Sequence, residues 1–128
     1  MSQPAAALTV IYANDITRVA EFYQRTLSLA LRDEEDGFIV VGNEAYEVAV
    51  VRMAGDSAAA ASNAAQLRTQ AAVKASFLVE SLDQTIAAAE ACGGATKPVT
   101  SAWRWRNQLH LDGNDPEGNV VQFRVGAA

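Results

Sequence analysis

The sequence has few of the residues that build disulfides, metal centres and membrane spans. Its single cysteine, Cys92, excludes an internal disulfide and favours a reducing compartment. Its single histidine, His110, cannot supply a metal site that needs two histidines from one chain. No apolar run approaches the length of a membrane span, and no basic segment precedes an apolar one at the N-terminus. We therefore expect a cytoplasmic protein with no membrane partner.

The charge balance argues against a nucleic-acid partner. The chain has 10 basic and 15 acidic residues and a net charge of -5, whereas phosphate binding needs clustered Lys and Arg. Such a charge is compatible with a cationic ligand, although solubility alone explains it. Half of the 128 residues are apolar, which is ample for a core. The length predicts one domain, or two small modules that share a sheet.

The first half of the chain predicts a strand, a helix and three further strands. Residues 8–13 are rich in β-branched residues, and Asn14 or Asp15 can cap the helix that follows. A charged turn over residues 32–36 and a turn at Gly42 separate the later strands. The helix carries its apolar residues at helical spacing: Ile16, Val19, Ala20, Phe22, Tyr23 and Leu27.

The second half repeats this order. Residues 73–79 alternate as a strand, Ser81 and Gln84 form a capping box, and the helix ends before Gly93. Extended segments follow at residues 95–100 and 103–112. Residues 54–72, rich in Ala, Ser, Asn and Gln, predict a connector. We therefore divide one structural domain of the α+β class into a first module (1–53), a connector (54–72) and a second module (73–128).

The turn Asp115-Pro116-Glu117-Gly118-Asn119 leads into an alternating strand, Val120-Val121-Gln122-Phe123-Arg124-Val125. With the repeat and the aromatic pair Phe22-Tyr23, this pattern resembles the glyoxalase / bleomycin resistance / extradiol dioxygenase superfamily, also called vicinal oxygen chelate proteins. The resemblance implies two βαβββ modules that form a curved mixed sheet around a cleft. It also implies a homodimer.

The resemblance places metal ligands on the first and last strands of the modules. The matching positions in this sequence are Leu8, Lys74 and Gln122. Leucine has no donor atom, a protonated lysine repels a cation, and an amide oxygen is a weak ligand. We therefore expect no metal and no cofactor. An unfamiliar metal set of Glu47, Gln122 and His110 is the alternative.

The face opposite the helices is expected to hold the ligand. It combines apolar residues with a few polar points, as small-molecule sites do. Trp103 and Trp105 share one strand face and can form a flat stacking wall, or they can pack in the core or a dimer. Lys74 can instead be a solvated rim residue, and His110 a satisfied strand residue. The candidate ligand-binding residues are Tyr12, Lys74, Ser76, Trp103, Trp105, His110, Gln122 and Arg124.

These residues predict a metal-independent binding protein for a planar or aromatic small molecule, closest in kind to bleomycin-resistance proteins. No catalytic residue is assigned, and the pattern favours a binding protein over an enzyme. The alternative is a metal-dependent lyase, isomerase or dioxygenase of the same fold with an atypical metal site. A third interpretation is a module retained for binding a partner protein.

Overall fold

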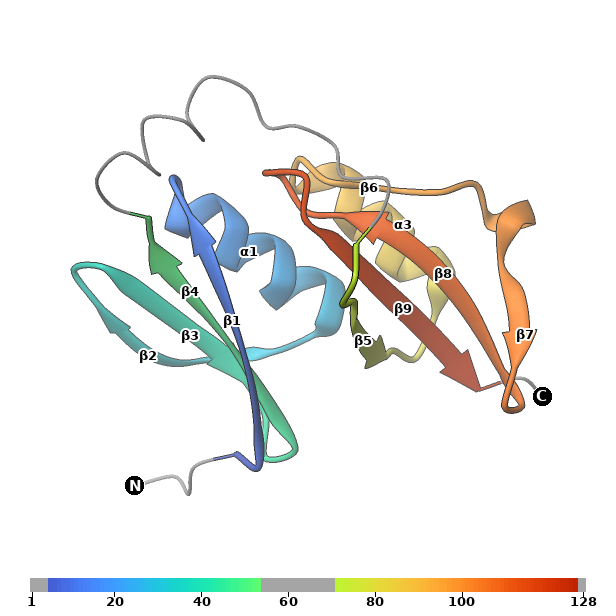
Figure 1. The fold of residues 1–128 in the computed structure, drawn as a ribbon, viewed down its shortest axis with the longest axis horizontal. Coiled ribbons are helices and arrows are strands. Elements are labelled where there is room, and N and C mark those ends of the chain that lie inside the picture. The colour runs from blue at the N-terminus through green and yellow to red at the C-terminus, as the bar shows by residue number, and fades with distance from the viewer. Residues whose placement is uncertain (1–4, 54–70, 127–128) are drawn as a thin grey trace.

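The chain folds into two modules that repeat one order of elements, and the computed structural model describes residues 5–53 and 71–126 (Figure 1). This confirms the predicted α+β fold of two βαβββ modules. The first module contains β1 (Ala7–Ala13), α1 (Ile16–Leu27), β2 (Ala30–Glu35), β3 (Phe38–Gly42) and β4 (Tyr46–Arg52). The second contains β5 (Ala75–Leu78), α3 (Leu82–Ala91), β6 (Ala95–Thr96), the 3₁₀ turn η1 (Val99–Ser101), β7 (Trp103–Trp105), β8 (Gln108–Asn114) and β9 (Val120–Gly126).

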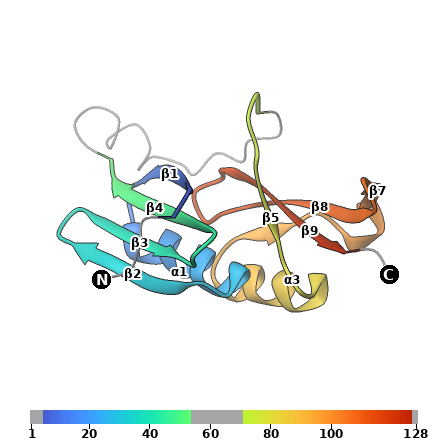
Figure 2. The ribbon, with the colours of Figure 1, turned by 90° about the horizontal axis from the view of Figure 1, so that it is seen from below.

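Each module forms a mixed sheet of its own with an equivalent strand order. Sheet 1 runs β1-β4-β3-β2, and sheet 2 runs β5-β9-β8-β6 with β7 also paired to β8. In each sheet the first strand of the module lies parallel to its last strand. The two helices contact each other and lie on the same side of the sheets (Figure 2). Neither of these helices covers the opposite face of either sheet, and we call these the open faces.

Helix α1 forms where the sequence predicts it. The Asp15 side chain caps it by accepting from the Arg18 N–H at 3.1 Å, and the helix ends at Ser28, whose φ of 54° is left-handed. The apolar residues recur every three or four positions, so they form one stripe that faces the core. All of the predicted stripe is buried: Ile16, Val19, Ala20, Phe22, Tyr23 and Leu27.

Helix α3 begins with the predicted Ser81 cap, which accepts from the Gln84 N–H at 3.2 Å. It ends at Cys92, and Gly93 then takes a φ of 85°. The next glycine, Gly94, has no room for a side chain, because an added Cβ would overlap the ring of Phe22. The modules therefore pack closely here.

No helix in the described parts of the chain is long and apolar enough to cross a membrane.

The turn that starts at Asp115 holds the two modules together. The Asp115 carboxylate is 3% exposed and accepts from the backbone N–H and the side chain of Asn119, both at 3.0 Å. It also accepts from the Tyr23 hydroxyl of α1 at 2.8 Å. The Glu117 carboxylate accepts from the Asn14 N–H at 3.0 Å, at the start of α1. These contacts fix the position of one module on the other.

Three predictions of turns or extended segments are wrong. The segment 95–100 is extended only in part, since β6 ends at Thr96 and η1 begins at Val99. Residues 32–35 continue the edge strand β2, and the turn falls at residues 36–37. Charged side chains suit an exposed edge strand, because they discourage pairing with other chains. Residues 103–112 form the β7–β8 hairpin instead of one extended segment, since Arg106 (φ 53°) and Asn107 (φ 61°) adopt the left-handed conformation of a two-residue turn. The predicted connector lies outside the described residues except for positions 71–72.

Candidate functional site

The open face of sheet 2 gathers polar side chains from three neighbouring strands. Alternate residues of a strand point to one face. The apolar residues that alternate with these polar ones along each strand therefore face the helices. The register pairs Ser76 with Gln122, Gln122 with Asp112, and Arg124 with His110. We call this set the polar face: Lys74, Ser76, Gln108, His110, Asp112, Gln122 and Arg124.

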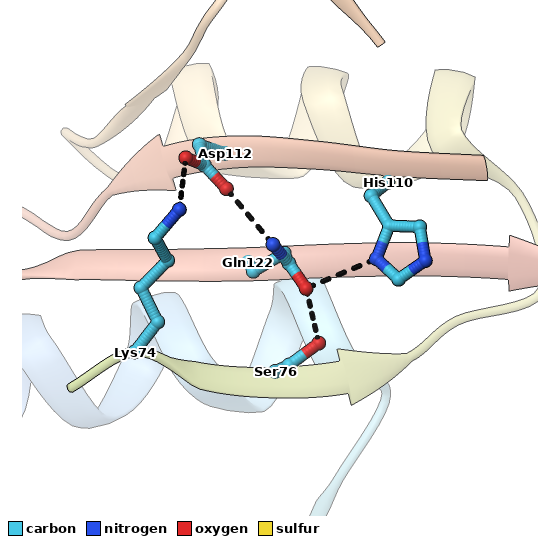
Figure 3. Close-up of polar contacts among 5 residues, drawn as sticks. All are labelled: Lys74, Ser76, His110, Asp112 and Gln122. Atoms are coloured by element: carbon cyan, nitrogen blue, oxygen red, sulfur yellow. Dashed lines mark hydrogen bonds and ion pairs between the residues drawn. The ribbon is translucent and has the colours of Figure 1, made fainter. Parts of the chain in front are cut away.

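A hydrogen-bonded chain crosses the polar face from Lys74 to Gln122 (Figure 3). The Lys74 Nζ donates to Asp112 Oδ2 at 2.7 Å, and the Gln122 Nε2 donates to Asp112 Oδ1 at 3.2 Å. An ionised carboxylate only accepts hydrogen bonds, so Asp112 fixes the orientation of the Gln122 amide. The Gln122 Oε1 must then point the other way along the sheet.

The Gln122 Oε1 is the meeting point of the remaining contacts. It accepts from the Ser76 Oγ at 2.7 Å, and the Arg124 Nε donates to that same Ser76 oxygen at 3.1 Å. The His110 Nδ1 lies 3.1 Å from Gln122 Oε1, and its Nε2 lies 3.1 Å from the backbone oxygen of Trp105. Both oxygens only accept, so both contacts are hydrogen bonds when both ring nitrogens of His110 carry protons.

The two tryptophans flank this histidine. His110 is 2% exposed, and its ring centroid lies 5.4 Å from the indole of Trp103 in a stacked arrangement and 5.5 Å from that of Trp105. The indoles themselves are 41% and 59% exposed, so they are not part of the core of this chain. Lys74 lies over the Trp103 ring at 5.7 Å, and Arg106 over the Trp105 ring at 5.6 Å. The result is an accessible aromatic wall at the edge of the polar face.

A cavity of about 740 Å³ lies between the two modules and reaches the polar face. Its lining includes Ser76 and Arg124 from sheet 2, Tyr46 from sheet 1 and residues of both helices. Burial raises the pKa of the Tyr46 hydroxyl, and the positive charge of Arg124 opposes this rise in pKa. The volume falls within the range of small-molecule sites.

The open face of sheet 1 has a different character. Leu8, Val10 and Tyr12 of β1 are all about half exposed, at 52%, 48% and 58%. Glu47 sits beside Leu8 on β4 and forms an ion pair with Arg32, at 2.8 Å between Nε and Oε2. This face is therefore largely apolar, with its central carboxylate already paired.

The residues at the matched metal positions do not fit a metal. Leu8 has no donor atom, Lys74 is engaged with Asp112, and the Gln122 amide oxygen already meets Ser76 and His110. Across residues 5–53 and 71–126, no three His, Cys, Asp or Glu side chains gather in a way that could hold a metal ion. The alternative set is also split, because Glu47 belongs to sheet 1, whereas His110 and Gln122 belong to sheet 2.

The structure brings together most of the residues that the sequence singled out. Tyr12 is the exception, since it lies on the open face of sheet 1. Asp112 and Gln108 were missed, although both belong to the network. The alternation of Gln108, His110 and Asp112 along one strand was the signal that could have found them. The gathered residues are Lys74, Ser76, His110, Gln122 and Arg124, with Trp103 and Trp105 at their edge.

Comparison with known proteins decides the family. The model of a family described as a glyoxalase-like domain matches residues 8–124, nearly the whole chain. The chain belongs to the glyoxalase-like domain family. No curated protein matches the sequence significantly.

Solved structures share the glyoxalase-like fold. A glyoxalase/bleomycin resistance protein/dioxygenase family enzyme from Burkholderia phytofirmans has a TM-score of 0.67 at 16% identity, covering 92% of this chain and 95% of that one. A glyoxalase/bleomycin resistance protein from Albidiferax ferrireducens has a TM-score of 0.67 at 17% identity, with coverages of 94% and 96%. The fosfomycin resistance protein FosX from Listeria monocytogenes has a TM-score of 0.65 at 11% identity, with coverages of 99% and 96%. At these identities the likeness establishes the fold alone.

Proposed function

We propose that this glyoxalase-like protein binds a planar or aromatic small molecule on the polar face of sheet 2, without a metal ion. One observation carries the proposal: Lys74 and Gln122, which occupy two positions where metal-using relatives hold ligands, are joined to each other through Asp112. An ammonium–carboxylate–amide chain stands at these positions. A metal-dependent lyase, isomerase or dioxygenase would have to break this chain before a cation could bind.

The aromatic wall supports a planar ligand. Trp103 and Trp105 expose their rings beside the hydrogen-bonding groups of the polar face. Stacking on an aromatic ring contributes about 0.5–1.5 kcal/mol beyond burial. The polar groups then orient the ligand, because a few well-placed donors and acceptors set specificity in such sites.

A second copy of the chain would complete the cleft. The open face of sheet 1 exposes Leu8, Val10 and Tyr12, and its outer strand carries the exposed carboxylates Asp33 and Glu35. An apolar strip with an acidic edge is complementary to the polar face, where Lys74 and Arg124 lie. Light scattering tests this association: the wild type should form a dimer, and Val10→Asp should shift it to monomer. A monomeric wild type would contradict it.

Intrinsic fluorescence tests the proposed binding directly. The chain has two tryptophans, and both lie on the aromatic wall, so their emission reports on this site alone. Titration with a panel of planar compounds should give a saturable change for at least one of them. The variants Trp103→Phe and Trp105→Phe, each with one remaining indole, would show which ring the ligand covers. A panel without any saturable response would overturn the proposal.

A further inference from the structure

The charge on the polar face is opposite in sign to that of the protein. The chain as a whole carries -5, but the polar face holds two basic side chains, Lys74 and Arg124, and a single carboxylate, Asp112. Lys74 and Asp112 neutralise each other at 2.7 Å. Arg124 is left as the charge without a counter-ion, since no carboxylate of the described residues pairs with it and its partners Ser76 and Gln108 are neutral.

Arg124 also has hydrogen-bonding capacity to spare. Its Nε donates to Ser76 and its Nη1 to Gln108 at 3.4 Å, whereas its Nη2 has no partner in the described parts of the chain. Arg124 is half-buried, yet no buried side-chain nitrogen or oxygen among the described residues lacks a partner. The Nη2 must therefore be open to solvent. Arg124 also lines the 740 Å³ cavity, so a ligand there can reach its side chain.

His110 belongs to the same site and brings no negative charge to it. It lies opposite Arg124 in the register of β8 and β9, and both of its nitrogens face oxygens that only accept. No carboxylate of the described residues contacts the ring; its neighbours are the Gln122 amide, the Trp105 backbone oxygen and the two indoles.

From this arrangement we infer that the ligand is a planar organic anion whose carboxylate, or a comparable anionic group, binds Arg124 while its ring stacks on the aromatic wall. This inference rests on the proposed function. It specifies an anionic ligand, although the chain as a whole has a negative net charge. The Nη2 of Arg124 can donate to a carboxylate, and hydrogen bonds between charged partners are about twice as strong as neutral ones. An anion also supplies the counter-ion that Arg124 lacks.

Three probes with one ring system and different charge test the ligand class. They are 2-naphthoate (anionic), 2-naphthamide (neutral) and 2-naphthylmethylammonium (cationic), each titrated calorimetrically into the full chain. We expect naphthoate to bind about tenfold more tightly than naphthamide, and the ammonium compound to bind most weakly. Added potassium chloride should weaken naphthoate binding and leave naphthamide binding nearly unchanged, because salt screens only the charged pair. The salt series needs no variant, so it does not depend on any substitution folding correctly.

Two substitutions assign the preference to one residue. Arg124→Gln should reduce the affinity for naphthoate to about that for naphthamide, and Arg124→Lys should keep part of the difference. Arg52→Gln is the matched control, because it removes the same charge from an exposed position on sheet 1 where Arg52 pairs with Asp36. It should keep the full preference. Loss of the preference in Arg52→Gln, or its survival in Arg124→Gln, would overturn the inference.

The outcomes separate this inference from the proposed function. If none of the probes and no compound of the planar panel binds, the proposed function fails and the inference fails with it. If all three probes bind with equal affinity, or the cation binds best, the proposed function stands and the anionic ligand class is wrong.

Discussion

The contact between Tyr23 and Asp115 offers a sharp test of how the two modules are held together. Tyr23→Phe removes one hydrogen bond, from the phenol hydroxyl to Asp115 Oδ2 at 2.8 Å, and keeps the ring. The edge-to-face contact of this ring with Phe22, at 5.0 Å between centroids, should persist. No cavity forms, so the change in stability reports the hydrogen bond.

The expected loss follows from the charge and burial of Asp115. A hydrogen bond to a charged group contributes about 1.5–3 kcal/mol, and the 3% exposed carboxylate keeps its other donors in the turn. We expect the free energy of unfolding to fall by about 2 kcal/mol. For a chain of 128 residues this lowers Tm by about 7 °C.

Urea unfolding followed by far-UV circular dichroism measures this loss at one fixed protein concentration, which matters if the protein is a dimer. Gly37→Ala is the control, because nothing lies within 4 Å of the Cβ that it would add and the change should be within about 0.5 kcal/mol. If Tyr23→Phe is no more destabilising than Gly37→Ala, the turn does not hold the modules together in the way described.

Three further predictions follow from the structure. Burial, and then Asp115, raises the pKa of the Tyr23 hydroxyl well above 10.0. The unfolded chain therefore loses this proton at a lower pH than the folded protein does. The stability that Tyr23 contributes is complete below about pH 10 and is lost as the pH rises further. Unfolding measured at increasing alkaline pH should show this loss, and Tyr23→Phe should reduce it. Gly94→Ala should cost about 1–3 kcal/mol in the same assay because its Cβ meets Phe22, whereas Gly37→Ala, with open space around it, should be nearly neutral. Trp105→Leu should weaken binding of a planar ligand by about 1 kcal/mol in calorimetry, and an unchanged affinity would remove this indole from the site.

Local signals in the sequence predicted much of the fold. The apolar spacing of α1, the caps at Asp15 and Ser81 and the turn at Asp115 all depend on residues close together in the chain. The structure confirms each of them. The charged part of β2, residues 32–35, was predicted as a turn because charged residues resemble a turn until the sheet beside them is known.

The sequence predicted part of the membership of the candidate site and none of its connections. Strand alternation placed Ser76, Gln122 and Arg124 on one face, and it placed Trp103 and Trp105 on a common side of their own strand. Which of them touch depends on the register of β8 against β9. The link through Asp112 was therefore invisible before the strands were aligned.

Metal-free binding is the central claim, and one comparison tests it most directly. The affinity for 2-naphthoate, or for the tightest compound of the planar panel, would be measured by calorimetry before and after chelator treatment, with metal content determined on the same samples. The account predicts one affinity throughout, with no stoichiometric metal, because Lys74, Asp112 and Gln122 bind one another. Loss of binding after chelation, with recovery on adding a divalent transition metal, would contradict it.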